Sequence, residues 1–352
     1  MVDGPREAFV VRLNSDASRP LAPDDLVLRD VGSSLEYSSS AVTIRIEGAQ
    51  SEDLHGNVIL VNPQRRVAQR LIRPDSRHNT FLVTERCDQL CVMCSQPPKA
   101  SEWNHFPLFA QAALLAPRGA VIGVSGGEPT LLKEDLFEFL EKVSAARPDL
   151  GFHVLTNGQH FEPTDGVRLK NLAARVEWGI PLYSHDPDVH DTIVGKVGAY
   201  SRLEDSLALM AAAGARVELR TVLTSLNHKS LAWLAHHVTR HVPFAETWAI
   251  MQLENIGYGR LNWNKLFVDT GQNFRNVGDA LTTAVAHGIT PRLYNFPLCT
   301  VPLPFRKYAV PSISDWKQKF IAECAACSSR NTCGGFFEWY PVGQGFGGIA
   351  AI

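Results

Sequence analysis

The chain has 352 residues, 45% hydrophobic and 20% charged, which is close to average globular usage and disfavours disordered, collagen-like and coiled-coil classes. Lysine and arginine number 34 against 36 aspartates and glutamates, so a net charge of −2 gives no support to non-specific nucleic-acid binding. No apolar run approaches the roughly 20 residues that a membrane helix needs. The chain begins without the basic-then-apolar order of a secretory signal, so we expect a cytoplasmic protein.

The first region, residues 1–75, is predicted to be β-rich. Short apolar or alternating segments are separated there by Asp, Pro, Ser and Gly, and no helix-period stretch of useful length is present. The predicted strands are 8–13, 25–31, 41–46 and 56–61. A stabilising β-layer is the simplest interpretation, and docking of a leader peptide by strand addition is the alternative.

The middle region, residues 76–272, alternates predicted strands and helices. Short, strongly apolar strands are typical of a parallel sheet covered by helices. Six β/α units favour an α/β fold with a partial (β/α)6 TIM-like barrel, and a doubly wound sheet is the alternative. The predicted strands are 80–85, 120–125, 151–156, 176–183, 216–223 and 247–254, and the helices include 106–116, 133–146, 201–214 and 230–242.

The last region, residues 273–352, is predicted to begin with one helix that ends near His287. A Pro-rich, weakly periodic tail follows, and it carries four of the seven cysteines. Low regularity together with clustered cysteines indicates a segment held by metal rather than by a hydrophobic core.

The cysteines fall into two groups. Three of them lie in CDQLCVMC, directly after the first strand of the predicted barrel, and four lie in the tail. An odd total without an export signal argues against a disulfide framework, and the short spacings favour metal or iron–sulfur ligation. The first group is Cys87, Cys91 and Cys94, and the second is Cys299, Cys324, Cys327 and Cys333.

The first group forms a Cys-x3-Cys-x2-Cys loop. Three thiolates leave one iron of a 4Fe–4S cluster without a protein ligand, and an open iron can chelate a small molecule with an amine and a carboxylate. A zinc site and inert cysteines are the alternatives. A zinc site would require a fourth protein ligand near the loop.

A second motif, SGGEPTLL at 125–132, follows the second strand of the predicted barrel. Gly126 and Gly127 allow close approach of the backbone to a ligand, and Glu128 places a carboxylate where a cationic amine can sit. Both motifs lie at the carboxyl ends of neighbouring strands, where barrel active sites form.

At these residues the chain resembles the radical S-adenosylmethionine (radical SAM) superfamily, over roughly residues 79–270. The resemblance implies that Cys87, Cys91 and Cys94 hold a 4Fe–4S cluster whose open iron binds S-adenosylmethionine, and that cleavage of this cofactor gives a 5′-deoxyadenosyl radical. The cofactor contacts that the resemblance implies are Met93, Gly126, Gly127, Glu128, Ser184 and Arg220. For Arg220, an ordinary ion pair with another side chain is an equal alternative.

The tail, with ECAACSSRNTCGGFF at 323–337, resembles the shortened auxiliary-cluster region (twitch or truncated SPASM) of peptide-modifying members. This implies one auxiliary 4Fe–4S cluster, and a structural zinc ribbon is the alternative. With every cysteine used as a ligand, no thiol remains to return a hydrogen atom to a substrate radical. That favours a net oxidation, such as bond formation between side chains. The implied auxiliary ligands are Cys299, Cys324, Cys327 and Cys333.

Longer strings, HNTFLVTERCDQLCVMCSQPPK and IPLYSHDPDVHDTIVG among them, resemble the His-Xaa-Ser system radical SAM maturases of the HxsC type. This resemblance implies a maturase that acts on a small ribosomally made precursor peptide with His-Xaa-Ser repeats. Together with the absence of a spare thiol, it predicts an oxidoreductase that cross-links side chains of this peptide. Its partners would be a companion radical maturase and an external electron donor, with no nucleic acid or membrane. The alternatives are a maturase that acts on an intact protein or a small molecule, and, from another class, a zinc-binding scaffold or partner-binding protein.

Overall fold

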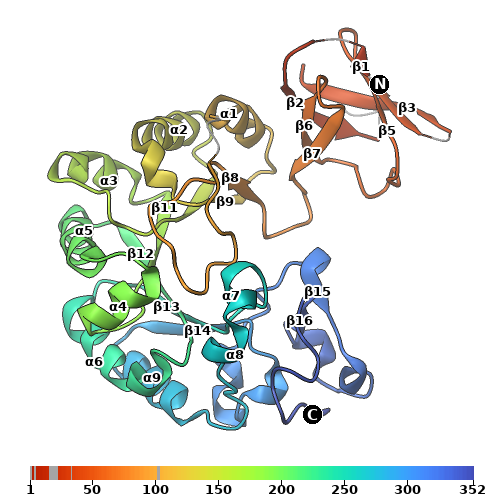
Figure 1. Cartoon of the computed structure of the whole chain (residues 1–352). Coiled ribbons are helices and arrows are strands. Elements are labelled where there is room, and N and C mark those ends of the chain that lie inside the picture. Colours follow the sequence, from red (N-terminus) through yellow and green to blue (C-terminus); the bar gives the residue numbers. More distant parts are fainter. Residues whose placement is uncertain (1, 4, 16–22, 33, 101–103) are drawn as a thin grey trace. The chain divides into compact units, whose positions relative to one another are not determined.

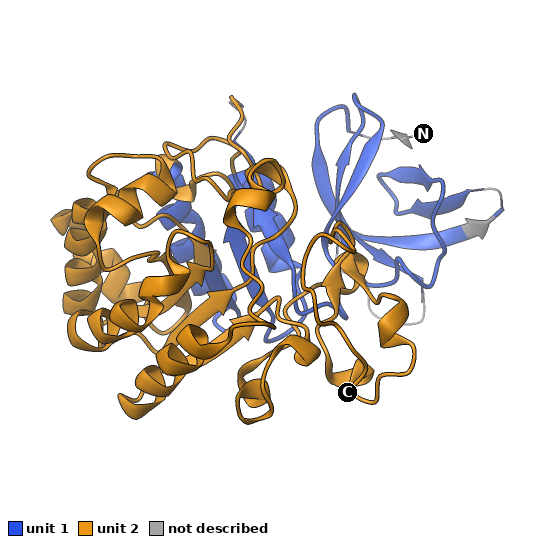
Figure 2. Ribbon diagram, turned by 60° about the horizontal axis from the view of Figure 1, so that its bottom comes forward, with its two compact units in different colours: residues 1–83, 102–125, 132–153 blue, residues 84–101, 126–131, 154–352 orange. Residues whose placement is uncertain are grey.

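A computed structural model describes residues 2–3, 5–15, 23–32, 34–100 and 104–352 (Figure 1). The chain divides into two compact units, one formed by residues 1–83, 102–125 and 132–153, the other by 84–101, 126–131 and 154–352 (Figure 2). The domain boundaries at 75 and 272 stay a prediction. No helix in the described ranges is long and apolar enough to cross a membrane.

The N-terminal part of the first unit is a seven-stranded sheet with the order β1-β5-β4-β3-β2-β6-β7. Its described pairs are antiparallel except β2–β3. Buried side chains such as Leu13, Tyr37 and Ile44 form its core, which confirms the β-rich prediction. The strands are β1 Val2–Asp3, β2 Phe9–Asn14, β3 Asp25–Val31, β4 Leu35–Ser38, β5 Thr43–Ile46, β6 Val58–Asn62 and β7 Val67–Ile72.

Strand β7 is one that the pattern did not predict. Its first four residues are all exposed, so it lacks the alternation of buried and exposed side chains that marks a half-buried strand. It lies at the end of the strand order, where only one neighbour covers it.

The second sheet has the order β14-β13-β12-β11-β10-β9-β8. The pairs β8–β9, β11–β12, β12–β13 and β13–β14 are parallel. The order follows the chain without the reversal that a doubly wound sheet requires, so the partial-barrel prediction is confirmed. The strands are β8 Thr80–Leu82, β9 Val121–Ser125, β10 Gly151–Leu155, β11 Val176–Pro181, β12 Arg216–Val222, β13 Thr247–Met251 and β14 Thr290–Tyr294.

Strand β14 corrects the six-strand count, because it adds a seventh strand to this sheet. It contains Pro291, and a proline within a short segment argues against a strand in sequence reasoning. β14 lies at the end of the strand order, where a residue without an N–H group is tolerated.

Helices follow most strands of the second sheet. In α2, the buried residues include Leu136, Phe137, Leu140 and Val143, the predicted stripe. The helices are α1 Phe106–Leu114, α2 Lys133–Ala146, α3 Gly166–Leu172, α4 Pro187–Val194, α5 Ala199–Ala213, α6 Leu231–His241, α7 Gly257–Leu261, α8 Trp263–Leu266 and α9 Arg275–Ala286.

The short helix α4 was not predicted, because its limits are set by caps rather than by a long apolar period. Asp186 accepts hydrogen bonds from the N–H groups of Asp188 (2.9 Å) and Val189 (3.4 Å), and Pro187 occupies the first turn. Gly195, with φ of 65°, ends the helix.

The tail is mainly turns and short 3-10 segments. A small antiparallel pair, β15 Gln318–Lys319 and β16 Phe336–Phe337, is its main regular element. Phe336, Tyr340 and Phe346 form a small buried cluster beside it.

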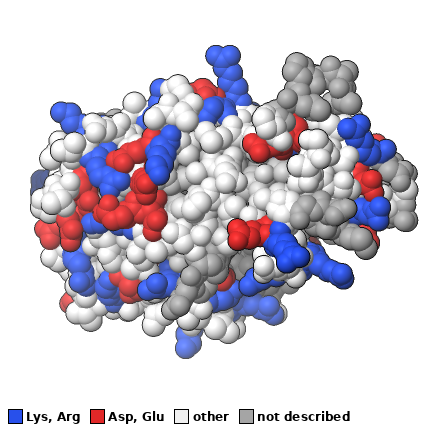
Figure 3. Space-filling model, turned by 90° about the horizontal axis from the view of Figure 1, so that it is seen from above, with Lys and Arg blue, Asp and Glu red and all other residues white. Residues whose placement is uncertain are grey.

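On the face shown in Figure 3, acidic and basic side chains are interspersed.

Candidate functional site

The loop after β8 carries the first three cysteines, all partly buried free thiols. A turn in which the Cys94 N–H donates to the Cys91 carbonyl (3.0 Å) folds this loop. Burial and the neighbouring thiols raise the pKa of Cys91 to about 12, and burial raises that of Cys87 to about 11. Because each thiolate opposes ionisation of the next, the group favours a bound cation, and three clustered sulfurs fit an iron–sulfur cluster.

The segment at the end of α4 holds this cysteine loop through the backbone. The Leu90 N–H donates to the Val194 carbonyl (3.1 Å) and the Val92 N–H to the Ile193 carbonyl (2.9 Å). A Cβ on Gly195 would lie 2.6 Å from the Leu90 carbonyl oxygen, and its φ is positive. Glycine is therefore required where the two segments meet.

The side chain of Asp88 is a second anchor of the loop. Its Oδ2 accepts from Lys196 Nζ and lies 3.2 Å from His160 Nε2, and its Oδ1 accepts from Asn157 Nδ2 at 2.9 Å. Burial acts against ionisation, but the hydrogen bonds from His160 and Lys196 hold the pKa of Asp88 well below its usual range. We did not predict these residues; the position of Asp88 inside the cysteine loop was the available signal.

The Gly-Gly turn packs against the backbone that leads into Cys87. The Gly127 N–H donates to the Thr84 carbonyl (2.8 Å) and the Glu128 N–H to the Arg86 carbonyl (2.7 Å). A Cβ on Gly126 would lie 2.3 Å from the Thr84 oxygen, and one on Gly127 would lie 2.1 Å from the Arg86 oxygen. The two glycines are therefore required by packing of the chain itself, whatever ligand the turn binds.

Glu128 is fully buried, and its carboxylate is already hydrogen-bonded. It accepts from Thr130 N (2.8 Å), Thr130 Oγ1 (2.5 Å), Thr156 Oγ1 (2.5 Å) and Asn157 N (2.5 Å). A carboxylate offers about four lone-pair sites, so a cofactor amine would share its oxygens with these donors. The amine-binding role of Glu128 stays a prediction, beside a structural role that the sequence did not indicate.

The remaining predicted cofactor contacts are also buried or paired. Ser184 is 1% exposed, and its hydroxyl accepts from the Asp186 N–H at 3.0 Å. Arg220 Nη1 donates to Glu218 Oε1 at 2.7 Å, which is the ion pair weighed as the alternative. Met93 is buried in an apolar cluster. Contact of these three residues with a cofactor stays a prediction.

The tail brings the second group of cysteines together around one small pocket. Burial raises the pKa of Cys299 and that of Cys324. Four sulfurs around one pocket fit an iron–sulfur cluster, and they fit tetrahedral zinc equally well. The cysteines that line the pocket are Cys299, Cys324, Cys327 and Cys333.

Two backbone N–H groups point at one sulfur of this pocket. Leu298 N and Gly335 N donate to Cys333 Sγ at 3.4 Å and 3.3 Å. Such hydrogen bonds stabilise a thiolate, and around an iron–sulfur cluster they help to set the reduction potential.

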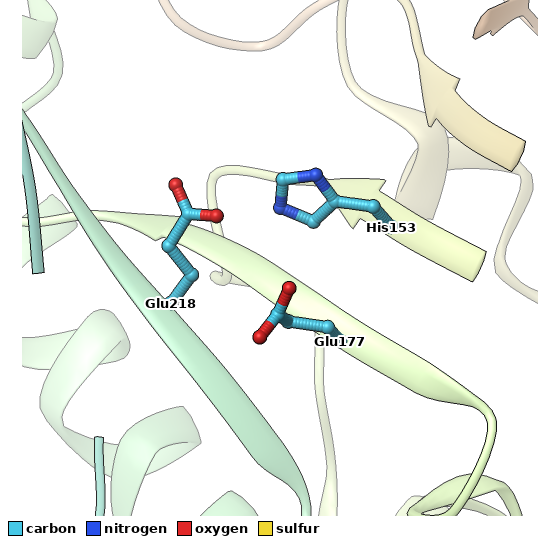
Figure 4. Close-up of side chains that lie close together, drawn as sticks. All are labelled: His153, Glu177 and Glu218. Atoms are coloured by element: carbon cyan, nitrogen blue, oxygen red, sulfur yellow. The ribbon is translucent and has the colours of Figure 1, made fainter. Parts of the chain in front are cut away.

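A separate pair of carboxylates, Glu177 and Glu218, belongs to the neighbouring strands β11 and β12 (Figure 4). Glu177 pairs with Arg216 Nη2 (3.3 Å), and Glu218 pairs with Arg220 Nη1 (2.7 Å). The arginines already supply the positive charge that a cation would bring, so the ion pairs explain these glutamates.

No family model matches the chain. Over 121 residues it is 31% identical to GTP 3',8-cyclase of Sulfurovum sp. (strain NBC37-1), a match that covers 32% of this chain and 36% of the cyclase. Among solved structures it is similar to Streptococcus suis SuiB bound to S-adenosylmethionine, with a TM-score of 0.49 and 13% identity over 62% of this chain and 50% of SuiB. It is also similar to anSMEcpe with bound AdoMet, with a TM-score of 0.46 and 14% identity over 60% of this chain and 63% of anSMEcpe.

These likenesses are partial, and membership of the radical SAM superfamily stays a prediction. The chain spans about a third of the GTP 3',8-cyclase matched by sequence and about half of SuiB, at 36% and 50%. The finer resemblance to maturases of the HxsC type stays a prediction.

Proposed function

We propose that this protein is a radical SAM enzyme that oxidatively cross-links side chains of a ribosomally made precursor peptide. The observation that carries the proposal is the separation of the cysteines into two donor sets, three on one anchored loop and four around one pocket. A set of three leaves a vacant iron position for a cofactor, whereas a set of four does not.

In this proposal Cys87, Cys91 and Cys94 hold the catalytic 4Fe–4S cluster. When bound, the cluster and S-adenosylmethionine supply the 5′-deoxyadenosyl radical. The chain's own contribution is preorganisation, because the end of α4 and the Asp88 network fix the loop, and the Gly-Gly turn packs against the segment before it. Met93 supplies apolar surface beside the cysteine loop, and Arg220, which is paired with Glu218, is a proposed contact of the cofactor.

The four tail cysteines hold the auxiliary 4Fe–4S cluster in this proposal. The N–H groups directed at Cys333 favour the reduced, more negative state of such a cluster, which suits a site that accepts an electron. Because all seven cysteines are then ligands, none is available to quench a substrate radical by donating a hydrogen atom. The outcome expected is a net oxidation.

A precursor peptide is proposed as substrate on the sequence resemblance to His-Xaa-Ser maturases. SuiB, which has a similar fold, has been solved with its precursor peptide SuiA. The proposal includes an external electron donor, a companion maturase and a cytoplasmic location. The candidate of another class is a zinc-binding scaffold, which the four-sulfur pocket alone would also suit.

Anaerobic purification followed by metal analysis tests this proposal. We expect a brown protein with about eight irons per chain, falling to about four in Cys91→Ala and in Cys327→Ala. Cys91→Ala should abolish cleavage of S-adenosylmethionine, whereas Cys327→Ala should keep the cleavage and lose the product. Mass spectrometry of the co-expressed precursor peptide should show loss of hydrogen. Colourless protein that contains zinc would refute the proposal.

A further inference from the structure

Glu254 is a carboxylate to which none of the preceding sections gives a role. It lies just after β13, at the carboxyl end of a strand of the second sheet, and its side chain is partly exposed. Among the described residues, no hydrogen bond or close ion pair to its carboxylate is present. A carboxylate that is partly exposed and has no such partner can be reached by a substrate group that releases a proton.

Two cations from different elements act on Glu254. Arg220 belongs to β12, and Lys317 belongs to the tail just before β15. Burial is the stronger influence and raises the pKa of Glu254 to about 7, although both cations lower it. A group with this pKa both takes up and releases a proton near neutral pH, as a general base must.

The segment that begins at Glu254 is attached to the cysteine loop. A Cβ on Gly259 would lie 2.3 Å from the Glu254 carbonyl oxygen, so this segment turns tightly. The Tyr258 N–H then donates to the Cys94 carbonyl at 2.8 Å, and a Cβ on Gly257 would lie 2.5 Å from the same oxygen. The backbone of Glu254 is therefore one short turn away from a residue that directly contacts the third cysteine.

Through the charge of Lys317, Glu254 also interacts with the part of the tail that carries the second group of cysteines. The Lys317 carbonyl accepts from the Glu338 N–H at 2.7 Å, next to the β15–β16 pair. Gly335, just before β16, donates to Cys333 Sγ. Glu254 thus lies on a segment that contacts the first group of cysteines, and it interacts with a segment linked to the second.

Other titratable side chains near the cysteine loop are less suited to accept a proton. Glu128 already accepts four hydrogen bonds and is the predicted contact of the cofactor amine, and Glu218 is paired with Arg220. Burial raises the pKa of Tyr183 well above its usual value, so it stays protonated.

We propose that Glu254 is a catalytic residue that accepts the proton released when the new bond forms in the substrate. This inference rests on the proposed function. A carbon radical, left after a substrate C–H bond has lost its hydrogen atom, joins a second substrate group that carries an X–H bond. The X–H bond breaks and a C–X bond forms. The proton goes to a Glu254 oxygen, and the one remaining electron goes to the oxidised auxiliary iron–sulfur cluster.

The test compares Glu254→Gln with the wild type in the fully reconstituted enzyme, using a precursor peptide deuterated at the reacting carbon. Deuterium in 5′-deoxyadenosine reports hydrogen abstraction, and the cross-linked peptide reports bond formation. We expect abstraction within about twofold of wild type and cross-linking reduced by about 100-fold or more, the usual contribution of a general base. The matched control is Glu246→Gln, at the amino end of β13, where the exposed carboxylate pairs with Arg216.

Two further measurements separate proton acceptance from a structural role. Wild-type cross-linking should fall as the pH drops through about 7, the pKa that burial gives Glu254, and this limb should be missing from the residual activity of Glu254→Gln. Infrared difference spectra of the substrate-free protein should show one carboxyl group that titrates near the same pH and is absent in Glu254→Gln. Formate should partly restore cross-linking in Glu254→Ala.

The outcomes are distinguishable. Normal cross-linking by Glu254→Gln, or an equal loss of abstraction and cross-linking without rescue of Glu254→Ala by formate, overturns the assignment of Glu254 alone. Absence of 5′-deoxyadenosine from the wild-type enzyme overturns the proposed function itself, and the inference with it.

Discussion

Replacing Lys196 with methionine tests the anchoring of the cysteine loop. The change keeps an apolar stem of similar length and removes the ammonium group that donates to Asp88. The two side chains are 21% and 24% exposed, so solvent screens their interaction only in part. A hydrogen bond to a charged group contributes about 1.5–3 kcal/mol, and His160 and Asn157 continue to contact Asp88 in the variant.

Because the Leu90 and Val92 amides donate to the end of α4, their hydrogen exchange reports opening of the loop. A loss of about 1.5–3 kcal/mol corresponds to exchange that is about 10- to 100-fold faster in peptides covering residues 88–94. Mass spectrometry of exchange in the metal-free protein measures this directly, without any contribution from a bound cluster.

The matched control is Lys142→Met, which removes an ion pair with Glu138 between side chains that are 71% and 57% exposed. Exposed pairs of this kind contribute about 0.3–0.5 kcal/mol, so exchange in the loop should be unchanged. Unaltered exchange of Leu90 and Val92 in Lys196→Met, or equal acceleration in both variants, would refute the reasoning.

Two other predictions concern packing and acid sensitivity. Gly127→Ala places a Cβ 2.1 Å from the Arg86 oxygen, so we expect a loss of about 1–3 kcal/mol in thermal unfolding and weaker iron binding. Gly348→Ala, with nothing within 4 Å, should leave both unchanged. Burial lowers the pKa of His190 from 6.5 to about 4. Between pH 6.5 and pH 4, His190 is therefore neutral in the folded chain and protonated in the unfolded chain. The contribution of His190 to the free energy of unfolding is fully present above pH 6.5, and it falls by about 1.4 kcal/mol per pH unit toward pH 4. Unfolding measured against pH should show a shallower acid slope in His190→Gln, and equal slopes would contradict the assignment.

Much of the fold was predictable because it depends on local pattern. The stripe of Leu136 and Leu140 predicts α2 within its observed bounds, and apolar runs predict six strands of the second sheet. Strand β14 escaped prediction because Pro291 is acceptable there only at a sheet edge, and edge position is not visible in a local sequence pattern.

The candidate site was predictable where the chemistry resides in short spacings, as in the two groups of cysteines. The partners that fix the site were not, since they come together only in the folded chain. Lys196 pairs with Asp88 across 108 residues, and the burial that sets the pKa of Glu254 comes from tertiary packing. Sequence reasoning assigned Gly126 to a ligand, which stays a prediction, and it did not predict the close approach of Gly126 to the Thr84 backbone.

The contacts between the Gly-Gly turn and residues 84–86 make the two segments move together. Two backbone hydrogen bonds join the segments, and at Gly126 and Gly127 there is no room for a methyl group between them, so their relative motion is restricted. A ligand that displaced the turn would therefore also displace the segment that leads into Cys87. If the proposed cluster is held by the first group of cysteines, electron paramagnetic resonance should register such a displacement as a change in the cluster's signal.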